Sequence, residues 1–298
     1  MKVSSLPDVT PAGAGRRVAI GTFDGVHLGH REVIRGADTV LTFDPHPLAV
    51  LRPEAAPRLI DTFAVKRDLI AELGVKELVV IPFDRELAAL EAEEFVQQVL
   101  VDRLGATHVA VGENFRFGSR AKGTPDLLRA SGEFETRVAE LVEVEGETVS
   151  SSHIRGLVAA GEVDMAARFL GRPFIFEGEV VAGDRRGREL GMPTANIVPD
   201  ERFVCPGHGV YAATASGHAA AVNVGVRPTF ETGRGLLVEP YLIDFEGDLY
   251  GQVLRVAFLE RLRGERRFDS TEALVDQMWR DVEMARAIAE RAATVSRR

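Results

Sequence analysis

The stretch "RVAIGTFDGVHLGH" (17–30) decides the fold of the first half of the chain. Its apolar beginning, 18–20, is typical of a short buried strand, and a glycine-bearing turn leads from it into a segment of helical character that stops near Gly36. A second β-type run, "TVLTFDP" (39–45), follows and ends in prolines. A strand, a helix and a strand in this order predict a βαβ unit whose parallel strands are joined by a right-handed crossover.

The same alternation of strands and helices continues to residue 171. It predicts an α/β fold with one Rossmann-like parallel sheet, and ligands of such sheets gather at the carboxyl ends of the strands. Those ends carry three polar loops, "GTFDGVHLGH" (21–30), "FDPHP" (43–47) and "VGENFRFG" (111–118). The further predicted helices cover 62–75, 91–105, 150–161 and 162–171, and the further predicted strands cover 77–83, 107–112 and 136–144.

The pattern changes after Gly171. Short β-type runs separated by Gly-, Pro- and Asp-rich turns replace the alternation, and one helix over 270–293, with Ser270 as its N-cap, closes the chain. This pattern predicts an all-β second half, a small antiparallel barrel followed by a terminal helix. We therefore predict two domains, 1–171 and 172–298. The β-type runs are 174–183, 209–216, 219–225, 236–245 and 251–260.

Composition limits the classes of partner. The formal net charge of −9 disfavours general nucleic-acid binding, and no apolar run approaches the roughly 20 residues that span a membrane. The beginning of the chain lacks the apolar core of a secretory signal. The single cysteine, Cys205, excludes an intramolecular disulfide and a cysteine-based zinc site, and we expect it to be a small packed residue. We expect a cytoplasmic protein, monomeric or weakly homo-oligomeric, without nucleic-acid or membrane partners.

Two histidines, His27 and His30, stand three residues apart where the first predicted helix begins. As zinc ligands they would need a third ligand, which His46 or His108 could supply. As phosphate contacts they would add donors to a helix N-terminus, where Gly25 and Gly29 let the backbone approach a triphosphate closely. The third reading is a solvated turn. The loop offers no nucleophile, so the phosphate reading implies direct transfer by positioning and charge stabilisation.

Four motifs of the first half occur in a characteristic order: "GTFDGVHLGH" (21–30), "TFDPHP" (42–47), "VGENFRFG" (111–118) and "VSSSHIR" (149–155). In this order they resemble the FMN adenylyltransferase module of the prokaryotic bifunctional riboflavin kinase/FAD synthetases, which belongs to the nucleotidyltransferase superfamily. The resemblance implies that His27 and His30 bind the phosphates of ATP and act in catalysis. It implies a nucleotide site that includes Gly21, Phe23, Asp24, Gly25, Asn114, Ser151, Ser152 and Arg155.

Two residue types in these motifs have alternative readings. The planar guanidinium of Arg155 can bind two phosphate oxygens at once, but it could equally be a surface arginine of a helix. Phe115 and Phe117 could line a flavin pocket, or they could anchor their own loop.

The segment "GDRRGRELGMPTANI" (183–197) carries the candidate metal ligands of the second half. Its Gly- and Arg-rich part, with Gly187, suits phosphate binding. Thr194 and Asn196 are two residues apart, so both face the same side of an extended segment and offer oxygen ligands suited to Mg²⁺. The alternative is a turn whose polar side chains bond to their own backbone.

An acid, Glu239, interrupts the apolar run "GLLVEPYLIDF" (235–245). A carboxylate there could accept the proton of an attacking hydroxyl, or it could be an outward-facing residue of an alternating strand. The motifs "GMPTAN" (191–196), "GVYAA" (209–213), "NVGVRPTF" (223–230) and "VEPYLIDFEGDLYG" (238–251) resemble the riboflavin kinase module, a six-stranded antiparallel barrel with a C-terminal helix.

The second resemblance implies that Thr194 and Asn196 bind Mg²⁺ and ATP phosphates, and that Glu239 is the base for the ribityl hydroxyl. Together the two modules imply a bifunctional enzyme that uses ATP and Mg²⁺. The C-terminal module would phosphorylate riboflavin to FMN, and the N-terminal module would transfer AMP to FMN, giving FAD and pyrophosphate.

The chain departs from the family pattern in the first helix. Eight residues, 31–38, separate His30 from the strand at Thr39, where family members usually have a longer helix, so this helix has about two turns. Met192 also replaces a more usual Phe. Two alternatives follow: a kinase with a degenerate N-terminal module, or a non-catalytic flavin-binding protein on the same fold.

Overall fold

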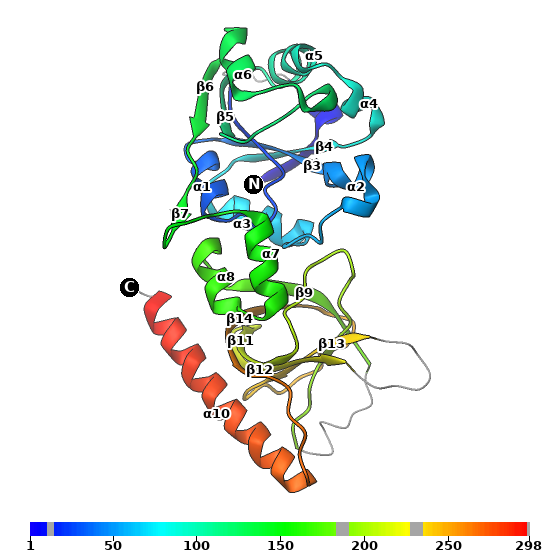
Figure 1. Ribbon diagram of the computed structural model, residues 1–298, viewed down its shortest axis with the longest axis vertical. Helices are drawn as coiled ribbons and strands as arrows, with labels where there is room; N and C mark the ends of the chain where they lie inside the picture. Colours follow the sequence, from blue (N-terminus) through cyan, green and yellow to red (C-terminus); the bar gives the residue numbers. More distant parts are fainter. Residues whose placement is uncertain (11–14, 183–190, 227–234, 297–298) are drawn as a thin grey trace. The chain divides into compact units, whose positions relative to one another are not determined.

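A computed structural model describes residues 1–10, 15–182, 191–226 and 235–296. The chain divides into two compact units, one formed by Met1–Pro57 with Phe63–Ser151 and the other by Arg58–Thr62 with Ser152–Arg298. Figure 1 labels most of the elements of each unit. The predicted domain boundary after residue 171 stays a prediction.

Among the described residues, the first unit is built on a sheet of six strands in the order β1-β4-β3-β2-β5-β6. All neighbouring pairs are parallel, which confirms the predicted sheet. The short edge strand β1 was not predicted. The strands are β1 (Lys2–Ser5), β2 (Arg16–Ile20), β3 (Thr39–Asp44), β4 (Glu77–Pro82), β5 (Ala106–Gly112) and β6 (Glu135–Ala139).

The strand order has a topological switch point at β2. Strand β2 lies between β3 and β5, so the chain leaves it toward one side of the sheet and later returns on the other side. Ligands of open α/β sheets bind outside the carboxyl ends of the strands at such a switch point. Because the sheet is parallel, the loops after β2, β3 and β5 lie along one edge, as predicted.

The helices of the first unit agree with the predictions in part. Helix α1 has two turns, and α3 ends before Gly74, whose φ is +82°. The helix predicted over 91–105 is a short α5 that continues as a π-helix, η3, and the strand predicted over 136–144 divides into β6 and β7. The elements are α1 (Leu28–Ile34), α2 (Pro47–Leu51), α3 (Phe63–Glu72), α4 (Arg85–Ala89), α5 (Ala92–Glu94), η3 (Phe95–Arg103), α6 (Pro125–Ser131), β7 (Glu143–Val144) and β8 (Glu147–Thr148).

Within the part of the chain that is described, the second unit contains a closed antiparallel barrel in the order β10-β13-β12-β11-β14-β9. This confirms the predicted six-stranded barrel. The strands are β9 (Phe174–Val181), β10 (Asn196–Ile197), β11 (Gly209–Ala215), β12 (His218–Val226), β13 (Leu236–Leu242) and β14 (Val253–Arg263). The helices are α7 (Ser151–Ala160), α8 (Val163–Leu170) and α10 (Thr271–Ser296).

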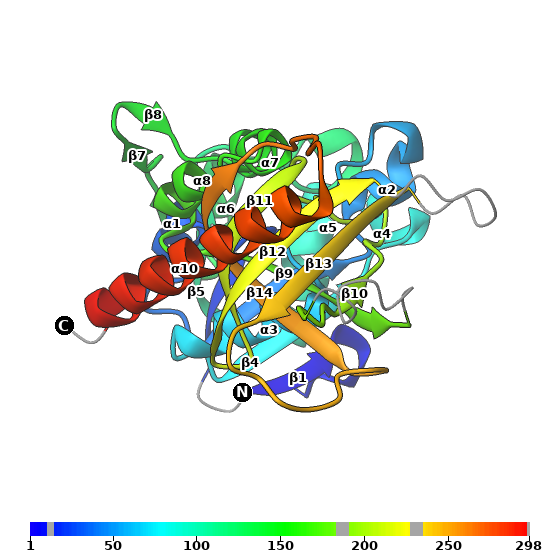
Figure 2. The same ribbon diagram turned by 90° about the horizontal axis from the view of Figure 1, so that it is seen from below.

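The terminal helix α10 covers one outer face of the barrel. Figure 2 shows it lying across the strands, and Val282 and Ala285 of α10 pack with Ala212 of β11 and with Ile243. The hydroxyl of Ser270 accepts the backbone N–H of Ala273 at 3.2 Å, so the predicted N-cap is confirmed.

A segment from the first half of the sequence, Arg58–Thr62, forms part of the second unit. Within it, the carboxylate of Asp61 accepts two hydrogen bonds from Arg172, at 2.8 and 2.9 Å, and its side chain is fully buried. The Thr62 hydroxyl donates to Glu177 of β9 at 2.6 Å. These contacts fix the segment to the barrel, and nothing in the local sequence pattern predicts them.

Cys205 is packed as expected. Burial raises the pKa of its thiol to about 12, against a smaller opposing effect of Arg58. The thiol is therefore protonated at neutral pH and unreactive.

Glu77 of β4 joins β1 and β2 into the sheet. Its carboxylate accepts hydrogen bonds from Ser4 at 3.0 Å and from Arg16 at 3.2 Å, and pairs with Lys2 at 3.1 Å. Burial acts to raise the pKa of Glu77, but the contacts with Lys2, Ser4 and Arg16 outweigh it and hold the pKa below 4.5.

Glu77→Gln is expected to lower the free energy of unfolding of the first unit by about 1–3 kcal/mol at pH 7. A carboxylate whose pKa is lower in the folded than in the unfolded state stabilises the fold at pH values above its unfolded-state pKa. The difference in free energy of unfolding between the variant and the parent is therefore full above pH 4.5 and shrinks as the pH falls below it. Urea unfolding between pH 7 and pH 3.5 measures this difference, with the exposed Glu72→Gln as the control. A difference that stays constant with pH would contradict the assignment.

Candidate active sites

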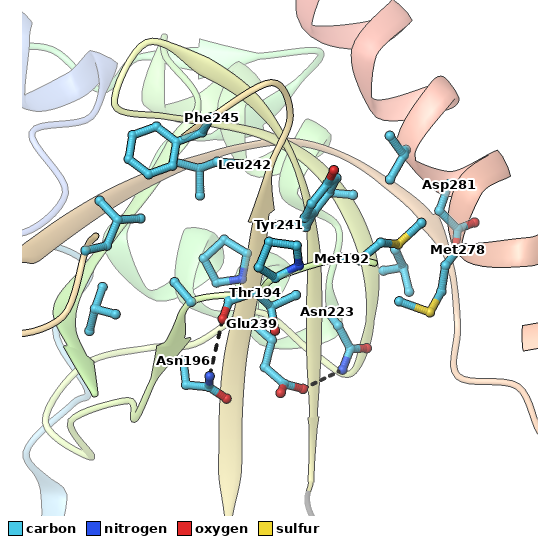
Figure 3. A pocket seen from close by; sticks show the side chains of 18 of the residues that line it. Met192, Thr194, Asn196, Asn223, Glu239, Tyr241, Leu242, Phe245, Met278 and Asp281 are labelled. Atoms are coloured by element: carbon cyan, nitrogen blue, oxygen red, sulfur yellow. Dashed lines mark hydrogen bonds between the residues drawn. The ribbon is translucent and has the colours of Figure 1, made fainter. Parts of the chain in front are cut away.

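A pocket of about 1520 Å³ lies in the second unit. Its walls come from the segment before β10, from β12 and β13, and from the chain between β14 and α10. Figure 3 shows that the side chains of Thr194, Asn196, Asn223 and Glu239 gather on one side of it. Three of these four are the residues that the sequence predicts for metal binding and proton transfer.

Glu239 lies on β13 directly opposite Asn223 of β12. The amide nitrogen of Asn223 donates to the Glu239 carboxylate at 3.1 Å (Figure 3). The next cross-strand pair along this face, Ala221 and Tyr241, packs toward α10. Glu239 is therefore on the outer face of the barrel, as the alternative reading expected, but this face is also the pocket wall.

Thr194 and Asn196 both line the pocket, together with the residues beside them, and their common side stays a prediction. The side-chain nitrogen of Asn196 donates to the backbone carbonyl of Thr194 at 3.5 Å. This is the local backbone bond that the turn alternative predicts. It uses the amide nitrogen and not the carbonyl oxygen, so it is compatible with a cation ligated by that oxygen.

A buried ion pair at the pocket wall was not predicted. Arg263 of β14 binds Asp281 of α10 through two nitrogens at 2.8–3.2 Å, and Gln277 donates to the same carboxylate at 2.8 Å. This network ties α10 to the barrel beside the pocket. The sequence holds a signal for it, because Asp281 stands three residues after Met278 and four before Ala285, on the apolar face of the helix.

In the first unit, the loop after β2 has an unusual backbone. Phe23 and Val26 have φ of +50° and +40°, and Gly25 has φ of +91°. The ring of Phe23 is buried and lies 3.0 Å from where a Cβ on Gly21 would stand, so a side chain at that position would collide with it. Left-handed conformations at non-glycine residues are costly and cluster at functional sites.

His27 and His30 form one unit at the beginning of α1. The Nδ1 atom of His27 accepts the backbone N–H of His30 at 3.2 Å, so His27 caps the helix. The two rings stack with centroids 3.5 Å apart, and Phe23 packs edge-on against His30. Because Nδ1 is the acceptor, the proton of His27 lies on Nε2, which can donate to a phosphate oxygen.

The zinc reading of these histidines finds no support. Among the described residues, no group of three or more His, Cys, Asp or Glu side chains lies together in a way that could hold a metal ion.

Three side chains hold the backbone of the histidine loop. The ammonium of Lys66 and the hydroxyl of Thr42 donate to the carbonyl of Thr22, at 2.9 and 3.2 Å. The hydroxyl of Ser151 donates to the carbonyl of Asp24 at 2.9 Å. Lys66 was missed, although a lysine three residues before the buried Leu69 of α3 marks it as a residue on the apolar face.

The remaining predicted residues of the two sites include both exposed and buried side chains. Asn114 is exposed in the turn after β5, and Phe117 is buried against Phe95 and Phe115 with ring centroids 5.5 Å apart, as a loop anchor would be. Ser152 and Arg155 lie on α7 in the second unit, where Arg155 donates to the Ser152 hydroxyl at 3.3 Å. Gly187 lies outside the described residues. That these residues bind a nucleotide or a flavin stays a prediction.

Comparison with known proteins finds two family matches. The model of FAD synthetase matches residues 10–153, and that of riboflavin kinase matches residues 170–289. A bifunctional riboflavin kinase/FMN adenylyltransferase of Pseudomonas fluorescens is 38% identical and aligns over 96% of this chain and 97% of its own length. A protein of the same description from Escherichia coli K12 is 36% identical and aligns over 90% of this chain and 91% of its own length.

Among solved structures, a crystal structure named as a macrolide-efflux protein from Streptococcus pneumoniae superposes with a TM-score of 0.85. It is 31% identical, and the match covers 96% of this chain and 99% of the other. In the part of the present chain that the structure describes, no helix is both long enough and apolar enough to cross a membrane.

Proposed function

Because the chain belongs to the family of bifunctional riboflavin kinase/FMN adenylyltransferases, we propose here which of its residues carry out the two reactions. The enzyme is a kinase and a nucleotidyltransferase: it phosphorylates riboflavin to FMN with ATP, and it adenylylates FMN to FAD. The FAD synthetase part comes first in the chain and the riboflavin kinase part second.

Riboflavin phosphorylation takes place in the pocket of the second unit, with Glu239 as the general base. The hydrogen bond between Asn223 and Glu239 is the observation that carries this proposal, because it fixes a carboxylate on the pocket wall. Glu239 accepts the proton of the ribityl hydroxyl while that oxygen attacks the γ-phosphorus, and the bond from the γ-phosphorus to ADP breaks. Such transfer depends mainly on positioning and on charge stabilisation.

Thr194 and Asn196 hold Mg²⁺ in this pocket. Their hydroxyl and amide oxygens are hard ligands, and the described bond of Asn196 uses its nitrogen, so the residues present fit the cation. Bound Mg²⁺ would neutralise phosphate charge. Gly187 contributes to the same nucleotide site.

FMN adenylylation takes place at the carboxyl end of β2, with His27 and His30 as donors to the phosphates of ATP. An oxygen of the FMN phosphate attacks the α-phosphorus, and pyrophosphate leaves with the electron pair of the broken bond. The imidazoles stabilise the charge that develops. The nucleotide site also takes in Gly21, Phe23, Asp24, Gly25, Asn114, Ser151, Ser152 and Arg155, and the flavin meets Phe115 and Phe117.

We further propose a cytoplasmic location and a monomeric or weakly associating state. The presence of a single cysteine, Cys205, supports the cytoplasmic location. The net charge of −9 supports a lack of nucleic-acid partners.

Asn196→Ala is expected to raise the Mg²⁺ concentration for half-maximal riboflavin phosphorylation about tenfold, because it removes one ligand oxygen. Riboflavin, FMN and FAD are separated by chromatography over time at a series of Mg²⁺ concentrations. The parent should pass from riboflavin through FMN to FAD, and the variant should still convert added FMN. Val198→Ala, two positions along the same segment and exposed, is the control. An unchanged Mg²⁺ dependence would remove Asn196 from the metal site.

A further inference from the structure

The C-terminal end of α1 is held by a side chain from β6. One terminal nitrogen of Arg137, Nη2, donates to the backbone carbonyls of Glu32, Val33 and Arg35, at 3.0, 2.7 and 3.0 Å. The other, Nη1, lies 3.4 Å from the Glu32 carboxylate. One guanidinium therefore contacts three backbone carbonyls, all within four residues at the end of a single helix.

These carbonyls have no helical partner because the chain turns away. After α1 the backbone turns at Gly36, whose φ is +78°, and enters β3 at Thr39. The Ile34 carbonyl accepts the N–H of Ala37 at 2.9 Å, within this turn. In a longer helix, the next turn would supply the other donors. Arg137 supplies them here, and a cation at a helix C-terminus also interacts favourably with the helix dipole.

The contact of Arg137 with the end of α1 matters because α1 is short and carries His30 in its first turn. A helix of seven residues is marginal by itself, so its position depends on its contacts. A change in the tilt of α1 would move the His30 ring relative to its stacking partner His27 and to Phe23.

We propose that Arg137 is a positioning residue for FMN adenylylation, acting through α1 on His30. Its donors are engaged with α1, so it need not touch substrate. It supplies donors at the end of a helix of only seven residues. The inference rests on the proposed role of His30.

Arg137→Met keeps the aliphatic part of the side chain and removes every donor. We expect the kcat for FMN adenylylation to fall about tenfold, with the KM for FMN within twofold of the parent, because α1 and not the flavin site is disturbed. Arg137→Lys keeps the charge and one donor group, and should recover part of the rate. The kinase rate of the same protein should stay within twofold. Arg129→Met removes an exposed arginine of α6 and is the matched control.

A double-mutant cycle with His30→Ala tests the route of the effect. If Arg137 acts through His30, adding Arg137→Met to His30→Ala should change the adenylylation rate less than twofold. The full tenfold loss in that background would overturn the inference. So would an Arg137→Met rate within twofold of the parent, or a parallel loss of both activities, which marks lowered stability alone. An unchanged rate in His30→Ala itself would refute the proposed role of His30 and the inference with it, whereas a loss in His30→Ala with normal Arg137→Met refutes the inference alone.

Discussion

Glu239→Gln is expected to lower the kcat for riboflavin phosphorylation by about 10²- to 10⁴-fold, because glutamine keeps the shape of the side chain but cannot accept the proton of the ribityl hydroxyl. Glutamine can still accept a hydrogen bond from Asn223, so the pocket wall should keep its arrangement. The same protein should convert added FMN to FAD at the parent rate, since Glu239 is not part of the proposed adenylylation site. Initial rates of both steps, measured by chromatography, give the two numbers.

Two controls separate loss of the base from loss of the pocket. Glu260→Gln changes an exposed carboxylate of β14 and should leave both rates unchanged. Quenching of riboflavin fluorescence on binding should give the same dissociation constant for Glu239→Gln and the parent. If Glu239→Gln retains more than a tenth of the parent kcat, the carboxylate is not the general base.

His27→Asn is expected to lower the kcat for FMN adenylylation by about 10²- to 10³-fold and to spare riboflavin phosphorylation. The two ring nitrogens of His27 have different tasks: Nδ1 caps α1, and Nε2 is the proposed phosphate donor. Asparagine is a good N-cap and places its side-chain oxygen near the Nδ1 position, so it should keep the helix while it removes the donor.

His27→Gln reaches the Nε2 position with an amide N–H and should recover part of the rate that His27→Asn loses. His108→Asn, at a half-buried histidine that lies 3.2 Å from Glu135, controls for loss of an imidazole elsewhere in the unit. The opposite ranking, with His27→Asn near the parent and His27→Gln inactive, would assign the function of His27 to capping and not to phosphate binding.

Elements with a strong local pattern could be predicted from the sequence. The apolar run before Gly21 predicted β2, the glycine at 74 predicted the end of α3, and Ser270 predicted the cap of α10, because each depends on neighbours within a few residues. The sequence also placed Thr194 and Asn196 in one site, and both line the same pocket, as do their neighbours in this segment.

Features that depend on contacts distant in the sequence could not be predicted. Strand β1 forms because it pairs with β4, which lies more than seventy residues later in the sequence. Asn223 becomes the partner of Glu239 through the register of two strands, and Arg137 meets α1 through the order of the sheet. No periodicity within either segment encodes these partners.

The contact between Asp61 and Arg172 bears on how the two activities can be separated. A gene fragment beginning at residue 152 or 172 encodes the barrel but not the fully buried carboxylate that Arg172 binds in the whole protein. Such a fragment would leave that guanidinium, with 9% of its side chain exposed, without its bidentate partner. Expression of the kinase half by itself therefore calls for a design that restores the five residues 58–62, as a fused extension or as an added peptide.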